Sequence, residues 1–226
     1  MKVRIIYILC LLFIFTNFAF ADELPLNNFA KTGEIGNYSF HLWDLASADR
    51  DNYEAIFNRA EDPKVEDFRG HKFNGLILFV TGGIGGNVIF SQYTGYDLDT
   101  LSGALASKPL TFQKRFYKRD KDNGESGINY WPMLGQESMP MNIKLSPAIG
   151  STSKNPINSL KIDYSVPSND GIFEKPLIDE VRQIPNSTLY IGKMHYRIGS
   201  KIGAHVLFLW FALERVEETG PIEKTF

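Results

Sequence analysis

The stretch LYIGKMHYRIGSKIGAHVLFLWFALE, residues 189–214, decides the fold of this chain. It predicts two strands, 189–197 and 204–214, joined by a turn at 198–203 that contains two glycines and a serine. Residues 206–213 are all apolar, which predicts a strand that is buried on both faces. In a barrel, a helix on the outside and a ligand cavity on the inside would bury the two faces.

Shorter β-prone segments occur from residue 73 onwards. Turn-rich stretches separate them, including a glycine cluster at 82–87 and a stretch rich in Ser, Pro and Asn at 146–158. Strands do not alternate with helices, which disfavours a Rossmann-type fold. The sequence therefore predicts a mainly antiparallel, lipocalin-like β-barrel with one or two short helices. Its other predicted strands are 73–80, 88–93, 110–118, 130–134, 141–145, 160–166 and 177–183.

One helix is predicted, over residues 47–60, between a serine that can cap it and a proline that ends the pattern. The segment before it, 22–46, is polar and turn-rich and is expected to be a loosely held arm. The barrel domain is expected over 47–216, followed by a short tail at 217–226. The apolar face of the helix consists of Tyr53, Ile56, Phe57 and Ala60.

Residues 1–21 have the pattern of a signal peptide. Lys2 and Arg4 precede an apolar run over 5–15, and Ala19-Phe20-Ala21 supplies the small residues of a cleavage site. The run is shorter than the ~20 residues that a spanning helix needs. We expect an exported protein, periplasmic or secreted, that begins at Asp22 and has no stable membrane insertion after cleavage.

The composition of the remaining 205 of the 226 residues narrows the function. The only cysteine, Cys10, lies in the leader, so disulfides, cysteine-ligated zinc and cysteine nucleophiles are excluded. Two of the 24 basic residues and none of the 26 acidic ones lie in the leader, so the rest carries a net charge of −4. That charge disfavours a nucleic-acid partner.

Three motifs that could bind phosphate or perform catalysis fit a simpler interpretation. The glycines at 82–86 are followed by a predicted strand rather than a helix, so they indicate a hairpin tip. The Ser-x-x-Lys match at 151–154 lies in a loop and lacks its companion motifs. The basic stretch 114–121 could contact an anion, but its interspersed aspartates favour a solvated strand end. No catalytic residue, metal site or cofactor is assigned.

The densest charged cluster on a predicted strand is IDEVRQ, residues 178–183. Alternation places Glu180 and Arg182 on one face, where they could pair. Our hypothesis is that this face points into the barrel and forms the polar end of an apolar cavity, with Arg182 holding the ligand and Glu180 holding Arg182. A purely structural ion pair is the equally weighted alternative.

Other candidate ligand-binding residues lie on the last two predicted strands. His195 and His205 flank the turn and are expected to be cross-strand neighbours, within reach of a shared ligand; an ordinary surface pair is the alternative. The four histidines lack the spacings of metal-binding motifs. Tyr190 and Trp210 complete the set as aromatic residues, and Trp210 is expected to be buried.

Several segments resemble, in order, a bacterial lipocalin-like group named for its Gly-x-Trp-x-Gly motif and its paired C-terminal domain of unknown function. They are FRGHKFNG at 68–75, FQKRF at 112–116, PLIDEVRQI at 176–184, TLYIGKM at 188–194 and FALER at 211–215. Phenylalanine stands where both motif strands of the group have tryptophan. The resemblance implies a small β-barrel and no known reaction.

The function expected from these observations is binding of a small, largely apolar or lipid-like molecule in the barrel, rather than catalysis. An aromatic content of 13% suits such a cavity. Two alternatives remain. One is an enzyme that uses Glu180, Arg182 and a histidine as acid–base groups, and the other is a secreted interaction protein with a filled barrel.

Overall fold

The computed structural model describes residues 24–81, 111–132, 134–152, 154, 156–169, 174–198 and 204–216. The predicted leader, the glycine cluster at 82–86, the strand at 88–93 and the tail at 217–226 lie outside these ranges. None of the helices in the described ranges is long and apolar enough to cross a membrane.

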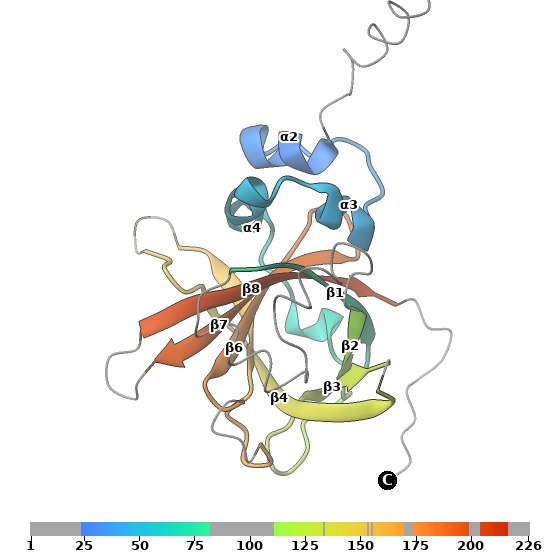
Figure 1. Ribbon diagram of the computed structural model, residues 1–226, viewed down its shortest axis with the longest axis vertical. Coiled ribbons are helices and arrows are strands. Elements are labelled where there is room, and N and C mark those ends of the chain that lie inside the picture. The colour runs from blue at the N-terminus through green and yellow to red at the C-terminus, as the bar shows by residue number, and fades with distance from the viewer. Residues whose placement is uncertain are drawn as a thin grey trace, which may run out of the picture.

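Eight strands form a closed antiparallel barrel in which each strand pairs with the next and β8 pairs with β1 (Figure 1). The predicted fold class is therefore confirmed. The strand predicted at 177–183 coincides with β6, and the predicted final hairpin coincides with β7 and β8 to within a residue. The strands are β1 (Lys72–Val80), β2 (Thr111–Phe116), β3 (Gly127–Trp131), β4 (Gln136–Pro147), β5 (Asn158–Asp163), β6 (Leu177–Gln183), β7 (Leu189–Ile198) and β8 (Ala204–Arg215).

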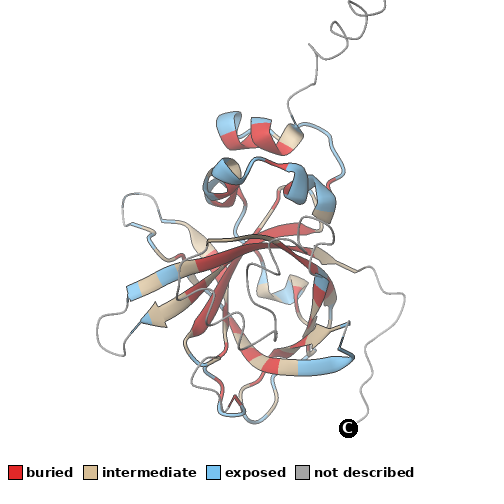
Figure 2. Ribbon diagram, viewed as in Figure 1, coloured by how far each residue is buried: buried red, intermediate tan, exposed pale blue. Residues whose placement is uncertain are grey.

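Strands β6, β7 and β8 are buried on both faces along much of their length, as Figure 2 shows. Their inward side chains, such as Val181 and Phe211, belong to the core inside the barrel. Their outward side chains, such as Ile191 and Trp210, belong to a second core outside it. The uninterrupted apolar run in β8 thus serves two cores, as its sequence predicts.

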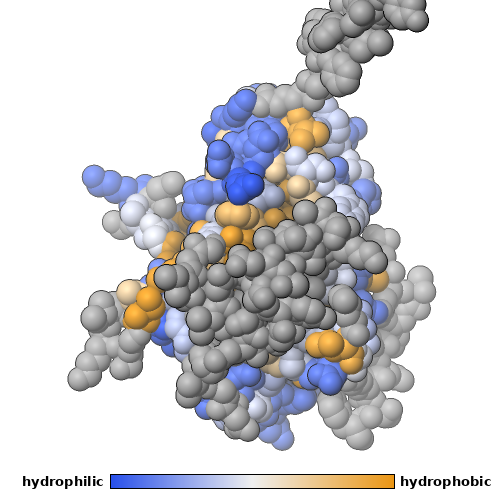
Figure 3. Space-filling view, in the orientation of Figure 1, coloured by the Kyte–Doolittle hydropathy of each residue, from blue (hydrophilic) through white to orange (hydrophobic). Residues whose placement is uncertain are grey.

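The second core is covered by the N-terminal helices, which lie on the outer face of the barrel above β1 and β8 (Figure 1). Hydrophilic side chains dominate the outside of this helical layer, and hydrophobic ones show where it meets the barrel (Figure 3). This helical layer consists of α2 (Pro25–Thr32), α3 (Leu42–Ser47), the 3-10 helix η1 (Arg50–Asn52) and α4 (Tyr53–Arg59). A second 3-10 helix, η2 (Val65–Asp67), lies apart from the layer, and its Val65 packs against the core inside the barrel.

Two expectations about this N-terminal region are wrong. Residues 22–46 are not a loosely held arm over their described part, because Leu26 and Phe29 of α2 are each only 1% exposed and pack in the outer core. The helix predicted at 47–60 begins later, because Ser47 ends α3, Ala48 is extended, and α4 starts only at Tyr53 after the 3-10 turn η1. Elements this short are not stable alone, so packing on the barrel decides their ends.

Aromatic side chains fill one end of the barrel. Phe68, which follows η2, stacks on Phe73 with ring centroids 4.7 Å apart and packs edge-on against Phe116 and Tyr190. Inside the barrel, Gly192 has no side chain, and a Cβ there would overlap the ring of Phe211. The glycine therefore permits the close approach of an aromatic ring across the strands.

Candidate functional site

Four polar side chains meet inside the barrel, completely enclosed by its core; we call Lys114, Asn129, Tyr164 and Asp179 the inner cluster. The Nζ of Lys114 lies 3.0 Å from Oδ1 of Asn129, 2.6 Å from the Tyr164 hydroxyl and 2.9 Å from Oδ2 of Asp179. Lys114 is 1% exposed and Asp179 is 0% exposed.

Strand register brings these residues together. Lys114 is opposite Phe73 on one side and Asn129 on the other, and all three side chains point inwards. Asp179 is opposite Ile162, another residue of the inner core, and Tyr164 directly follows β5. Lys114, Asn129 and Asp179 thus occupy inward positions of their strands, and Tyr164 joins them from the end of β5.

One oxygen of the inner cluster has no hydrogen-bond partner in the part of the chain that the structure describes. The three ammonium hydrogens of Lys114 have three acceptors, and the Tyr164 hydroxyl donates to Oδ2 of Asp179 at 2.7 Å. Oδ1 of Asp179 is buried and has no hydrogen-bond partner among the described residues. An oxygen in this state is an acceptor for a ligand that can donate a hydrogen bond.

Burial lowers the pKa of Lys114 below its ordinary value, and the carboxylate of Asp179 opposes that change. Aromatic rings also surround the ammonium group, which lies 5.4 Å from the ring centroid of Phe112 and 5.5 Å from that of Phe211. The inner cluster is thus an ion pair inside an apolar wall, with its charges balanced and one buried carboxylate oxygen without a hydrogen-bond partner within the described ranges.

Sequence reasoning missed this cluster. Taken as a whole, the basic stretch 114–121 favours a solvated strand end. That interpretation is wrong for Lys114, which is buried inside the barrel. The alternation Phe112, Lys114, Phe116 was the available signal, since the two phenylalanines mark the inward face. Lys118 and Arg119 are exposed, as expected.

Glu180 and Arg182 share a face, as predicted, but that face points out of the barrel and not into it. They alternate with Asp179 and Val181, which point inwards. Both remain buried because the helical layer and the loop after β4 cover β6 from outside. The prediction that Glu180 and Arg182 point inwards is therefore wrong. Every residue from 177 to 182 is buried, so an expectation of burial alone does not distinguish the two faces of the strand.

The contacts of these two residues hold neighbouring segments in place. Arg182 donates to the carbonyl oxygens of Ala60, just after α4, and Asn158, and it pairs with Asp62. Oε1 of Glu180 accepts from the backbone N–H of Ile149 at 2.7 Å. The arrangement fits the structural alternative rather than the cavity role.

Glu180 also faces two nitrogen-bearing side chains of β7. Its Oε2 lies 3.2 Å from Nε2 of His195 and 4.0 Å from Nζ of Lys193. Burial raises the pKa of Glu180, but the interactions with His195, Ile149 and Lys193 outweigh burial and hold it below its usual range. We call Glu180, Arg182, Lys193 and His195 the outer cluster.

The remaining candidate residues are divided between the two cores. Tyr190 lies inside the barrel against Phe68, and burial raises its pKa to about 12. Trp210 is buried as expected, but it faces outwards, 5.8 Å from the ring of Tyr53. The rings of His195 and His205 lie 6.3 Å apart, but the two residues are diagonal neighbours rather than directly opposite, since Leu207 is opposite His195 and Arg197 is opposite His205.

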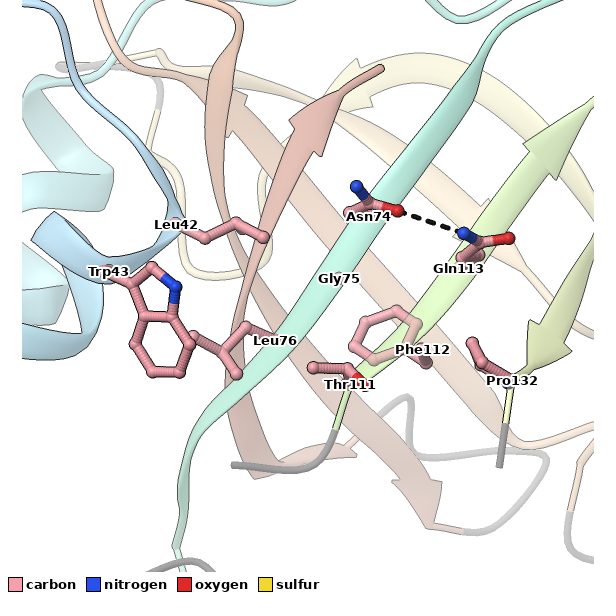
Figure 4. A pocket seen from close by; sticks show the side chains of 9 residues that line it. All are labelled: Leu42, Trp43, Asn74, Gly75, Leu76, Thr111, Phe112, Gln113 and Pro132. Carbon is pink, nitrogen blue, oxygen red and sulfur yellow. Dashed lines mark hydrogen bonds between the residues drawn. The ribbon is translucent and has the colours of Figure 1, made fainter. Parts of the chain in front are cut away.

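Within the described part of the chain, no group of three His, Cys, Asp or Glu side chains is arranged to hold a metal ion. A groove of about 280 Å³ lies on the outer surface between α3 and strands β1 and β2 (Figure 4). Its walls include Leu42 and Trp43 on one side and Asn74 and Gln113 on the other. The groove contains no member of either cluster, although Phe112, whose ring lies 5.4 Å from Nζ of Lys114, lines it from the barrel side.

Comparison with protein-family models, curated proteins and solved structures gave no significant match for this chain.

Proposed function

We propose that this protein is exported and binds a small, largely apolar molecule inside its barrel, with the inner cluster as the polar end of the site. The observation that carries the proposal is the complete burial of the inner cluster with Oδ1 of Asp179 unpaired. The ligand would have an apolar body and a hydroxyl or N–H group that donates to this oxygen.

The free-energy cost of burying charged groups supports a functional reason for the presence of the inner cluster. A lysine–aspartate pair is expensive to desolvate, and an apolar pair of similar size often stabilises a protein at least as well. An unpaired buried carboxylate oxygen adds a further penalty. A barrel that only needed a packed core would be better served by aliphatic residues here, so ligand recognition accounts for their presence.

The two ends of the barrel are packed differently. Phe68 and its aromatic neighbours occupy one end. Towards the other end, partly buried side chains pack against the inner core: Val80, Trp131, Met194 and Tyr196. An eight-stranded barrel is wide enough for side chains or one small ligand. We infer that the apolar body lies towards this second end, with the donor group at the inner cluster.

Two sequence observations support the same proposal: the signal-peptide pattern supports export, and the resemblance to the Gly-x-Trp-x-Gly group supports a lipocalin-like barrel. Export would place the protein where small apolar molecules need a carrier because they dissolve poorly in water. N-terminal sequencing of the exported protein should begin at Asp22; recovery of intact Met1 in the membrane fraction would contradict export with cleavage.

Native mass spectrometry of purified mature protein is the first test, because a bound molecule would appear as added mass. Thermal melts with 2-naphthol and with its methyl ether then test the donor requirement: the naphthol should stabilise the protein more. The double variant Lys114→Met/Asp179→Leu should stay folded and lose this stabilisation. Arg182→Met, in the outer cluster, is the control that should keep it.

Equal stabilisation by naphthol and its ether would contradict the role of Asp179. Full retention of ligand by the double variant would show that the inner cluster is structural.

A further inference from the structure

The groove in Figure 4 combines an exposed aromatic ring with neutral amide groups. Trp43 is 58% exposed, although it belongs to a helix whose neighbouring Leu45 is completely buried. Leu45 attaches α3 to the barrel, so Trp43 is not needed for that purpose. Its indole forms one wall of the groove, with Leu42 and Leu76 beside it.

The opposite wall is held in a fixed orientation by a chain of hydrogen bonds. Arg115 donates to Oε1 of Gln113 at 3.1 Å, and Gln113 donates through Nε2 to Oδ1 of Asn74 at 3.0 Å. Arg115 is itself held by Glu137 at 3.2 Å and by the ring of Tyr130. Since Oδ1 of Asn74 faces Gln113, its Nδ2 is turned towards α3 (Figure 4).

The lining selects the chemistry of a ligand. None of the nine lining residues, all in the described part of the chain, carries a formal charge. A charged ligand would gain no partner, and a purely apolar one would leave the oriented amide without a hydrogen bond. A sugar ring has a C–H face that packs on an aromatic face and an edge of hydroxyl groups that accept and donate hydrogen bonds.

We propose that this groove is a binding site for one ring of a neutral saccharide. The ring would pack its C–H face on Trp43 and accept a hydrogen bond from Nδ2 of Asn74. The volume of about 280 Å³ is just below the ~300–1,000 Å³ of drug-sized ligand sites, which suits a single ring. Binding at this site does not depend on the function proposed for the barrel interior.

The test uses methyl glycosides of glucose, galactose, mannose and N-acetylglucosamine as probes, followed by the fluorescence of Trp43 and by NMR. At least one should bind in the millimolar range and change the Trp43 signals, and glucuronic acid should bind more weakly. Trp43→Ala should weaken binding about tenfold or more, equivalent to ~1.4 kcal/mol. Asn74→Asp should weaken it too, because the acceptor for Gln113 stays while the donor is lost.

Tyr38→Ala is the matched control, since Tyr38 is equally exposed at 58% but does not line the groove. It should bind the glycoside as the wild type does. Failure of all four glycosides to bind would overturn the proposal. So would equal binding of cyclohexanol, which would reduce the groove to an apolar patch, or a self-association that Trp43→Ala abolishes.

Discussion

The inner and outer clusters begin one residue apart, at Asp179 and Glu180 of β6, yet they have opposite surroundings. The members of the inner cluster bond mainly to one another inside the barrel, and Asn129 also donates to Sδ of Met139. The outer cluster reaches away from the wall, to the backbone of Ile149 and Ala60 and to the carboxylate of Glu54. Buried charge therefore has two settings here: the outer cluster fastens segments to the barrel, whereas the inner cluster connects no described segment outside the barrel and is the site that we propose for a ligand.

The largest expected effect is that of breaking the inner pair on one side. Lys114→Met leaves Asp179 buried without its counter-ion, and we expect a loss of ~3–5 kcal/mol in the free energy of unfolding. Urea melts measure this. The double variant Lys114→Met/Asp179→Leu should recover most of the loss, because it removes both charges. If it is as unstable as the single variant, the inner cluster is needed for stability.

The outer cluster should respond more moderately. Arg182→Met removes a cation that holds Asp62 and two carbonyl oxygens, so we expect a loss of ~2–3 kcal/mol in urea melts. Arg197→Met is the control: its partner Asp163 is 3.9 Å away and both are partly exposed, so the loss should stay below ~1 kcal/mol. Equal effects of the two variants would contradict a fastening role for Arg182.

Acid should test the contribution of Glu180, in the outer cluster, to stability. The pKa of Glu180 is lowered from its ordinary 4.5, so its contribution to stability is complete above pH 4.5 and is lost as the pH falls through the folded-state value. Glu180→Gln should flatten the dependence of stability on pH in this window. An unchanged slope in the variant would show that Glu180 does not gain from its partners on folding.

The smallest effect concerns an exposed contact, the 2.7 Å pair between His41 and Glu214 that links the start of α3 to β8. The hydrogen bond to Glu214 raises the pKa of His41 above 6.5. Its contribution is therefore complete below pH 6.5 and disappears as the pH rises through the folded value. NMR titration of the His41 ring should show the raised pKa, and Glu214→Gln should return it to its ordinary value.

The amino-acid sequence by itself determined the strands of the second half of the barrel, because their hydrophobic runs, turn residues and spacing are local signals. It also determined that β8 has two buried faces, since 206–213 offers no polar side to solvent. It indicated that Glu180 and Arg182 share a face, because alternation is a property of any strand.

Only the tertiary structure decided which face of β6 lies inside the barrel. LIDEVRQ has polar residues on both faces, and a shift of one residue in register would exchange them. Closure of the barrel fixes that register through the neighbouring strands, and it turns Asp179 towards Lys114 and Glu180 towards His195. The short helices α2, α3 and α4 depend on the same closure, because they are stable only on the apolar outer face that β7 and β8 complete.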